Sequence, residues 1–488
     1  MVILGYGLPT LLILALLIIR RRPAGYGRLL NSLSVANAAV CLGLTVYLMV
    51  QDSFPRYFLG GHDLFIDLLG IYQVLIASAV FLLAAFYARG YVYGLLQAGE
   101  IDRTSLKLFY AAFNLLLVVI IFAFFANNLA LFWLLLELTT ILSAVLIVTL
   151  NARENILAAL KYVFIASTAM LFSFIGIIIV FAMTQHALGK GTLNWTELMA
   201  AASSLPANLA VIAFIFLFIG FAAKAGIVPF HTWLPPAHAK APSVISALLS
   251  AVLLNLGVYG VLRVFAVVRQ ASHTPAAPVL LITFGVVSIG IAAFSMLARE
   301  NIKKLIAFSS IEHMGLLLVG IGLGTPVTIF WVLFHNLGHA LVKSLLFFSA
   351  GILHRQYGSN KYQDMSDVLG LQPLASAGII IGGAAIIGTP LFPIFLSKLF
   401  ILIQLGSFSL PLLLVVLVFL LIAAAAFALF LVRTCCRKTE GVTLERYRVP
   451  WSMKAPIIVL MVAILALGIF FPQSLQNMLR NIVASLGF

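Results

Sequence analysis

Fourteen long apolar segments run through the 488-residue chain, and they constrain its fold more than any other feature. A helix needs about 20 apolar residues to cross the hydrocarbon core of a bilayer. A backbone inside lipid must satisfy its own hydrogen bonds, so continuous runs of this length predict spanning helices. We expect an all-α polytopic membrane protein with about 14 transmembrane helices, over 2–19, 29–50, 64–88, 108–126, 129–150, 156–182, 208–228, 243–268, 278–298, 302–323, 327–352, 374–405, 408–432 and 453–473.

The composition excludes several other classes. With 63% hydrophobic and 9% charged residues, the chain does not resemble a water-soluble protein. The apolar runs are continuous rather than alternating, which excludes an outer-membrane barrel. Its three cysteines are too few for an iron–sulfur cluster or a zinc site, and no Walker A loop or dinucleotide fingerprint occurs. We therefore expect no cofactor and no metal on this chain, and the energy for any transport must come from a gradient or from partner subunits.

The net charge of +15 reflects membrane topology rather than nucleic-acid binding. With the N-terminus outside, the cytoplasmic loops hold twenty Lys and Arg residues, and the opposite side holds four. We expect a multi-pass protein of a prokaryotic plasma (inner) membrane with both termini outside. In the segment from Val2 to Ile19 the charges Arg20, Arg21 and Arg22 follow the apolar run, so it is a first spanning helix rather than a signal peptide.

The apolar stretch from Val327 to Gly351 carries His335, His339 and Lys343 at i, i+4 and i+8. This spacing places all three on one helix face. A charge near the bilayer centre costs about 2.5–3.5 kcal/mol, so the face points to a hydrated interior rather than to lipid. Interhelical hydrogen bonding is one alternative. A zinc site is another, although HExxH is absent and no third ligand lies nearby. We favour a proton relay.

Two further spanning segments carry isolated charges, Glu137 and Lys224. A buried ion pair often fails to repay its desolvation, so stability alone is a weak reason for such a pair. Burial lowers the pKa of a lysine and a nearby carboxylate raises it, so a lysine with a movable partner can alternate between charged and neutral forms. We expect both residues to serve ion translocation.

Two spanning segments are interrupted by helix-breaking residues. Pro229 follows Lys224, and Pro390 and Pro393 precede Lys398. Paired broken helices indicate a transporter core built from two related halves. We expect inverted five-helix repeats of helices 4–8 and 9–13, with the chain divided into 1–107, 108–268, 278–432 and 433–488.

Several other polar residues lie in or beside the apolar segments. Glu312 and His313 lie inside a spanning segment one turn after Ser309 and Ser310, whose hydroxyls either hold water or bond back to the helix. His231 and His238 lie near the first helix break and are candidates to gate access from the cytoplasm. Three other residues are expected near helix ends or the interface, namely Lys161, Arg263 and Asp67.

These motifs resemble the antiporter-like subunits shared by respiratory complex I, Mrp-type Na⁺/H⁺ antiporters and membrane-bound [NiFe] hydrogenases. The resemblance covers residues 60–405 and rests on FWLLLELTTI, LKYVF, FAAKAGIVPFHTWLPPAHAKAPSVISALLS, AFSSIEHMG, FHNLGHALVKSLLFFSAG and GTPLFPIFLSKL. APSVISALLS and SSIEHMG look most similar to the hydrogenase-4 and formate hydrogenlyase type. Because little sequence follows the last apolar segment, we expect no long lateral helix of the kind found in the largest complex I relative.

The resemblance implies roles for particular residues. Glu137 and Lys224 would form the first half-channel pair, with Lys161 and His231 nearby. His335, His339 and Lys343 would carry the central connection, and Lys398 would end the second half-channel. Glu312 lies in a matching motif and is a further expected residue of the proton path. Many relatives have a lysine or histidine where this chain has Asn255, in LLNLGVYGVLR. Asparagine can hydrogen-bond a water but cannot carry a proton, so the link between the halves is expected to be weaker or water-mediated.

The resemblance implies a proton-translocating membrane subunit of a redox-driven hydrogenase-type complex, with Na⁺ as the alternative ion. Its partners would be other membrane subunits and a peripheral arm with iron–sulfur clusters. A complex I subunit and a stand-alone Mrp-type cation/proton antiporter are the alternatives.

Overall fold

The computed structural model describes residues 2–18, 26–51, 56–58, 62–150, 152–437 and 445–488. Helices dominate these residues. The first eight are α1 (Val2–Ile18), α2 (Tyr26–Val50), α3 (Leu68–Gln97), α4 (Arg103–Phe125), α5 (Leu129–Ile147), α6 (Arg153–Leu188), α7 (Trp195–Ala200) and α8 (Ala207–Ala225). The others are α9 (Leu234–Lys240), α10 (Ser243–Leu248), α11 (Leu254–Ala271), α12 (Ala276–Leu297), α13 (Ile302–Leu323), α14 (Pro326–Tyr357), α15 (Val368–Leu371), α16 (Pro373–Ile387), α17 (Pro393–Phe408), α18 (Leu410–Cys435), α19 (Trp451–Ile469) and α20 (Gln473–Ser485).

Short elements complete the fold. The 3₁₀ turns are η1 (Ala202–Ser204), η2 (Phe230–Trp233) and η4 (Tyr362–Asp364), and η3 (Leu249–Leu253) is a π-helical turn. A small antiparallel hairpin pairs β1 (Arg56–Phe58) with β2 (Leu64–Ile66), in the register Tyr57 opposite Phe65.

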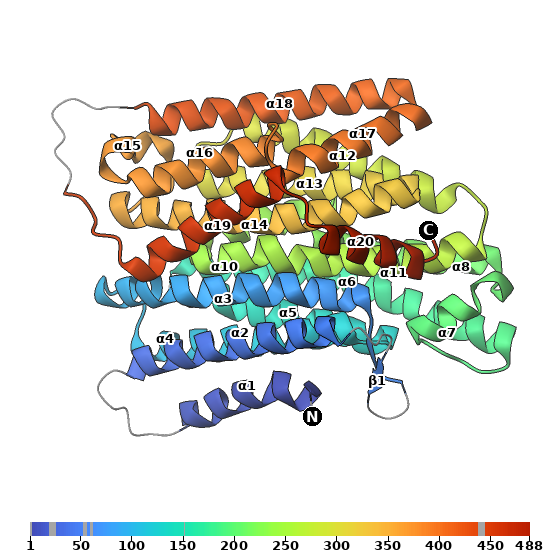
Figure 1. The fold of residues 1–488 in the computed structure, drawn as a ribbon. Helices are drawn as coiled ribbons and strands as arrows, with labels where there is room; N and C mark the ends of the chain where they lie inside the picture. Colours follow the sequence, from blue (N-terminus) through green and yellow to red (C-terminus); the bar gives the residue numbers. More distant parts are fainter. Residues whose placement is uncertain (1, 19–25, 52–55, 59–61, 151, 438–444) are drawn as a thin grey trace.

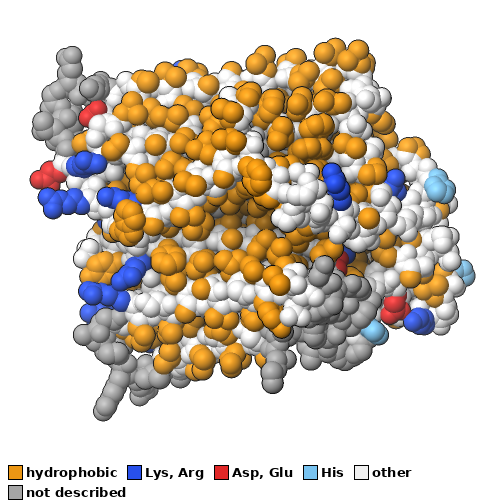
Figure 2. Space-filling model, in the orientation of Figure 1, with side chains coloured by type: hydrophobic (Ala, Val, Ile, Leu, Met, Phe, Trp, Pro, Cys, Tyr) orange, Lys and Arg blue, Asp and Glu red, His pale blue; other side chains and the backbone are white. Residues whose placement is uncertain are grey.

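The long helices lie side by side in one bundle, with α18 along one flank and α1 along the other (Figure 1). Apolar side chains cover the lateral face of the bundle that Figure 2 shows, and Lys and Arg gather mainly at one end of it (Figure 2). This distribution is what a positive-inside topology requires, although the compartment that each end faces stays a prediction. Arg20, Arg21, Arg22, Lys438 and the side chain of Arg56 belong to that prediction and lie outside the described residues.

Within the described residues, 12 helical segments are long and apolar enough to cross a membrane. The shorter α1 and the pair α16–α17 account for the other two of the fourteen predicted segments. The expectation of an all-helical polytopic bundle is confirmed, whereas the division into inverted repeats stays a prediction.

Burial separates the central helices from the peripheral ones. The most apolar stretches of α10–α11 and of α13 are 100% buried, against 22% in α18. A helix that is buried on every side can hold polar groups away from lipid, because neighbouring helices supply their partners. Glu312, His313 and Asn255 of the candidate site lie on these fully buried helices, and His335, His339 and Lys343 lie on α14, whose most apolar stretch is 83% buried.

Both predicted helix breaks are present. α8 ends at Gly226 (φ +74°) and α16 ends at Gly388 (φ +91°), each in the left-handed conformation that favours glycine. Each break frees backbone carbonyls at a helix C-terminus, and side chains satisfy them. The Trp233 indole donates to the Ala223 carbonyl at 3.0 Å. The Lys398 ammonium donates to the carbonyls of Ile386 and Ile387, both at 3.3 Å.

Asp67 lies at the start of α3, as expected, and its partner is Arg263. Both are buried, and the Arg263 guanidinium lies 2.6 Å from an Asp67 carboxylate oxygen. The other carboxylate oxygen accepts from the Gly70 amide, so Asp67 also caps the N-terminus of α3. Arg263 lies over the ring of Tyr259 as well. The two residues form a buried ion pair that joins α3 to α11, because a charge that is removed from water needs a partner.

Replacing Arg263 with methionine is expected to destabilise the protein by about 3–5 kcal/mol, because Asp67 is left buried without its counter-ion. The measurement is the thermal unfolding midpoint of the purified complex in detergent. Adding Asp67→Asn should recover most of the loss, since asparagine can still cap Gly70. Equal midpoints for the single and double variants would show that the pair is not the cause.

Candidate functional site

Eight buried ionisable side chains of the candidate site come from five helices, α8, α9, α13, α14 and α17. They fall into three groups, one around the end of α8, one along the middle of α14, and one between α13 and α17. The buried members are Lys224, His238, Glu312, His313, His335, His339, Lys343 and Lys398.

Neutral oxygens surround Lys224 at the C-terminus of α8. Its ammonium lies 2.7 Å from the Thr140 hydroxyl, 3.2 Å from the Leu136 carbonyl and 3.3 Å from the Tyr162 hydroxyl. The side chain is 1% exposed. Three oxygen acceptors match the three N–H donors of an ammonium, so the protonated form is held without any anion in contact.

Glu137 is not in contact with Lys224. None of the ion pairs within 4.0 Å among the described residues joins them, although the Glu137 charge acts on Lys224 at longer range. Instead, one Glu137 carboxylate oxygen accepts from the Ser167 hydroxyl of α6 at 2.9 Å. The other is buried without a partner among the described residues. Glu137 and Lys224, which were expected to form a pair, therefore lie at two separate sites.

The corresponding pair at the second helix break is in direct contact. The Lys398 ammonium lies 2.8 Å from Glu312 of α13, and both side chains are buried. The same ammonium bonds the free carbonyls at the end of α16. The negative end of the α16 dipole therefore adds to the Glu312 charge in stabilising the cation. Glu312 and Lys398 were both expected on the proton path, but their contact was not predicted from the sequence.

The α14 stripe faces the interior over its whole length. The Lys343 ammonium donates to the Ile306 carbonyl at 2.7 Å and to the Ser309 hydroxyl at 2.5 Å. One His335 ring nitrogen lies 2.8 Å from the Ser397 hydroxyl of α17, and the other lies 2.8 Å from the His313 ring. Both nitrogens of His339 are buried without partners among the described residues. The three residues thus share one buried face.

His313 is the link that the sequence did not reveal. Its ring lies 5.0 Å from that of His335 and 5.4 Å from that of His339, between centroids. Its second nitrogen lies 3.1 Å from the Ile386 carbonyl, which also accepts from Lys398. One backbone oxygen therefore joins the histidine cluster to the Glu312–Lys398 pair. The position of His313 next to Glu312 was a signal, but its partners come from other helices.

Two hydroxyl groups meet between η3 and α13. Ser250 lies in the π-turn η3 that leads into α11, and its hydroxyl is 2.8 Å from that of Ser310 on α13. Ser310 and Lys343 both bond to the Ile306 carbonyl. A π-turn in an otherwise α-helical segment is frequent at functional sites.

Asn255 lies buried on α11, in the part of the helix that packs against α8. Its amide donates to the Ala251 carbonyl at 2.8 Å, and its oxygen has no partner among the described residues. Gly257 permits this close packing, since a Cβ there would lie 2.5 Å from the Ala225 nitrogen, next to Lys224. Asn255 thus lies close to the end of α8 that carries Lys224, and its place in the link between the half-channels stays a prediction.

Two predicted site residues do not join the buried groups. Lys161 lies on the exposed face of α6, and His231 of η2 is half-buried with one ring nitrogen unpartnered. The Lys161 charge acts on His231, so the two lie near each other. His238 is different, because it is fully buried and stacks on Phe347 with 4.9 Å between ring centroids. Lys343 and Lys303 both lie within electrostatic reach of it.

Other contributors to the site carried no charge signal in the sequence. Thr140, Tyr162, Ser167 and Ser397 supply hydroxyls to the charged groups. Isolated hydroxyl residues are common in spanning helices, where they bond back to their own turn. Only the helix packing distinguishes these from the rest.

The arrangement can pass protons between titratable groups. Hydroxyl, imidazole, carboxylate and amine groups can each give up or accept a proton, and here they lie on helices of one bundle whose interior is shielded from lipid. Intramembrane ionisable residues of this kind mark ion pathways. The fold and site thus define an ion-translocating membrane protein.

A family model described as NADH:quinone oxidoreductase/Mrp antiporter, transmembrane, matches residues 126–424. The chain is 30% identical to the hydrogenase-4 component F homolog of Methylacidiphilum infernorum over 344 residues, which are 70% of this chain and 72% of that protein. It is 27% identical to NADH-quinone oxidoreductase subunit N of Desulforudis audaxviator, covering 91% and 90%. Hydrogenase-4 component B of Escherichia coli is 28% identical, covering 72% and 52%. The chain belongs to the NADH:quinone oxidoreductase/Mrp antiporter family, as its motifs predicted.

Solved structures share the fold over nearly the whole chain. A chain of the membrane-bound sulfane sulfur reductase, an archaeal respiratory membrane complex, matches with a TM-score of 0.86 at 22% identity, covering 99% of this chain and 96% of that one. A chain of the Mrp complex from Dietzia matches with 0.84 at 19% identity, covering 99% and 97%. A chain of complex I from Thermus thermophilus matches with 0.80 at 22% identity, covering both chains fully. The fold is therefore that of antiporter-like membrane subunits.

Proposed function

We propose that this chain is the proton-translocating membrane subunit of a redox-driven complex of the [NiFe]-hydrogenase or formate-hydrogenlyase type. The observation that carries the proposal is the series of buried ionisable groups from Lys224 to Lys398, held by hydroxyls and carbonyls inside a membrane bundle. The similarity to hydrogenase-4 components favours the hydrogenase type.

Each group has a distinct role in this proposal. Lys224 takes up or releases a proton in the first half, and Glu137 modulates it electrostatically across the gap between them. Lys343, His339, His313 and His335 form the central relay. Glu312 and Lys398 form the final station, where separation of the pair would free the Lys398 ammonium to release its proton. Lys161 and His231 would serve the approach to Lys224 from the surface.

The seam between the halves needs a carrier other than Asn255, because an amide does not exchange protons readily. A hydroxyl both donates and accepts, so the Ser250–Ser310 pair can pass a proton where Asn255 cannot. Ser310 and Lys343 both donate to the Ile306 carbonyl, so the Ser250–Ser310 pair would deliver protons to the central relay. In this proposal Ser250 of the π-turn η3 carries the proton from the first half-channel to the second.

Replacing Ser250 with alanine should lower proton translocation by about tenfold, at the lower end of what a positioned proton-transfer group contributes. The fold should survive, because Ser310 keeps its bond to the Ile306 carbonyl. Proton uptake into vesicles containing the purified complex is the measurement. Ser173→Ala is the matched control, since the Ser173 hydroxyl bonds to Met170 of its own helix. Equal loss in both variants would refute the bridging role.

The metal and flavin content of the purified complex tests which kind of peripheral arm accompanies this chain. The chain would be tagged and purified in mild detergent, and the eluate analysed for metals and flavin. Nickel together with iron supports the hydrogenase-type complex. Iron and flavin without nickel would instead favour a complex I subunit, a candidate supported by the full-length similarity to subunit N. An eluate without metals and without flavin would favour a stand-alone antiporter and would exclude redox coupling. Repeating proton uptake with and without Na⁺ distinguishes the two candidate ions.

The proposed location is the plasma membrane of a prokaryote, with both termini outside. The clustering of Lys and Arg at one end of the bundle supports it. A reporter active only in the cytoplasm, fused after Phe488, should stay inactive. Activity of that reporter would reverse the orientation.

A further inference from the structure

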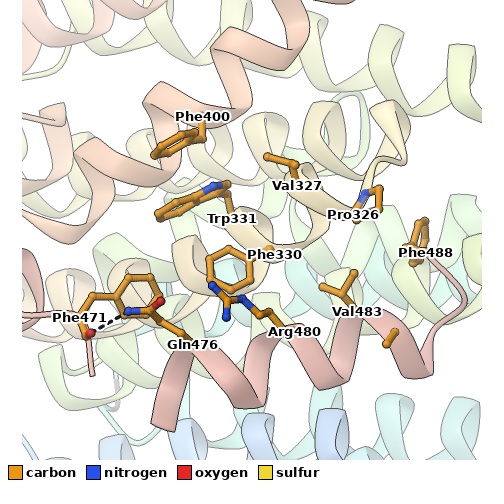
Figure 3. Close-up of a pocket in the computed structure, with 11 residues that line it drawn as sticks. Pro326, Val327, Phe330, Trp331, Phe400, Phe471, Gln476, Arg480, Val483 and Phe488 are labelled. Atoms are coloured by element: carbon orange, nitrogen blue, oxygen red, sulfur yellow. Dashed lines mark hydrogen bonds between the residues drawn. The ribbon is translucent and has the colours of Figure 1, made fainter. Parts of the chain in front are cut away.

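A groove lies outside the proton path, between the N-terminal half of α14, α17 and α20. Its volume is about 680 Å³, which is in the range of ligand sites. It opens on the flank of the bundle, toward the end opposite the main cluster of basic side chains (Figures 1 and 2). Figure 3 shows α14 and α17 on one side of it and α20 on the other. No residue of the groove belongs to the site described above.

Aromatic side chains form the deep wall of the groove. Trp331 of α14 stacks on Phe400 of α17, with 4.4 Å between centroids and 3° between planes. Phe330 and Phe471 continue the wall at 5.9 Å from each other. A rigid apolar wall of this kind, open along the flank, offers its surface to a hydrocarbon chain, because burying apolar area on it is favourable.

A cation lies along the opposite wall. Arg480 of α20 is exposed, and Figure 3 shows its guanidinium extending toward Phe330. Among the described residues, none forms an ion pair with Arg480 within 4.0 Å. The neighbouring Gln476 is already engaged, donating to the Phe471 carbonyl at 3.0 Å. A second guanidinium, that of Arg269, lies 4.8 Å above the ring of Phe488 at the same end.

The groove therefore combines one long apolar wall with cationic groups at its rim. A helix of a partner subunit would meet the aromatic wall equally well, but it would not need an anion at Arg480. A molecule with one anionic head and a hydrocarbon tail satisfies both features. We propose that the groove binds an anionic phospholipid, with its phosphate at Arg480 and an acyl chain against Trp331, Phe330 and Phe400.

The test is native mass spectrometry of the intact complex, purified with this chain and titrated with phosphatidylglycerol or phosphatidylcholine. We expect phosphatidylglycerol to bind preferentially. Arg480→Gln should weaken that binding by about fivefold, the effect of one basic side chain on an anionic lipid. The matched control is Lys190→Gln, at the same end of the bundle. Lys190 already pairs with Glu197 at 2.8 Å and lowers the pKa of that carboxyl, so its charge is not available to a phosphate.

A second variant tests the tail without touching the charge. Val327 lines the groove and is 42% exposed, so Val327→Trp should fill the space and reduce binding of both lipids. Equal binding of the two lipids by the native protein would overturn the proposal. So would binding that is unchanged in Arg480→Gln, or a cryo-electron microscopy map of the complex with a partner polypeptide in the groove.

Discussion

Replacing Lys224 with methionine is expected to abolish proton translocation, with a loss of about 100-fold or more, while the complex still folds and assembles. A positioned proton-transfer group contributes on this scale. The measurement is proton uptake into vesicles containing equal amounts of assembled wild-type or variant complex.

The structure explains why folding should survive this change. Lys224 contacts only neutral oxygens, so its removal breaks no direct ion pair. Thr140 keeps a bond to the Leu136 carbonyl, and Tyr162 keeps one to Ser143. Glu137 keeps its bond to Ser167. Replacing a buried ion by an apolar side chain of similar size is often neutral or stabilising.

The matched control is Lys361→Met, which removes an exposed lysine at the surface of the bundle. Its proton uptake should equal that of the wild type. Wild-type uptake by the Lys224 variant would exclude Lys224 from the path. Loss of assembly in that variant would contradict the structural reasoning instead, so the two failures are distinguishable.

Local rules gave the helices and both breaks. The apolar runs fix spanning helices because lipid leaves the backbone no other solution, and Pro229 and Pro393 lack the amide hydrogen that a continuous helix needs. These effects act within a few residues, so they can be read without knowing the packing. The face of α14 that carries His335, His339 and Lys343 was predictable for the same reason, since helical periodicity alone sets it.

Contacts between distant segments could not be predicted in this way. Asp67 and Arg263 were predicted as separate residues near helix ends or the interface, and no local pattern indicates that they pair across 196 positions of the chain. Lys161 was placed in the path because it lies in a family-like motif, but the packing of α6 turns its side chain outward. His313 gained its importance only from the helices that surround it. Periodicity shows that a face is polar, but packing decides which other face it meets.

Removing Lys398 should have a different outcome from removing Lys224, because Lys398 is the only one of the two in contact with a carboxylate. Lys398→Met is expected to abolish proton uptake and also to destabilise the protein by about 3–5 kcal/mol, since Glu312 remains buried without its cation. The thermal unfolding midpoint in detergent measures the second effect. The matched control is Lys240→Met, which breaks an ion pair with Glu154 at the surface. It should cost no more than about 1 kcal/mol.

The double variant Glu312→Gln with Lys398→Met separates stability from function. With neither charge of the pair left, its unfolding midpoint should return toward that of the wild type, whereas proton uptake should stay lost. The difference between the double variant and the sum of the single variants gives the coupling of the pair. If the double variant were as unstable as Lys398→Met, the unpaired carboxylate would not be the cause. If the double variant recovered transport, the Glu312–Lys398 ion pair would serve stability alone, and the last proton-carrying group of the path would lie elsewhere.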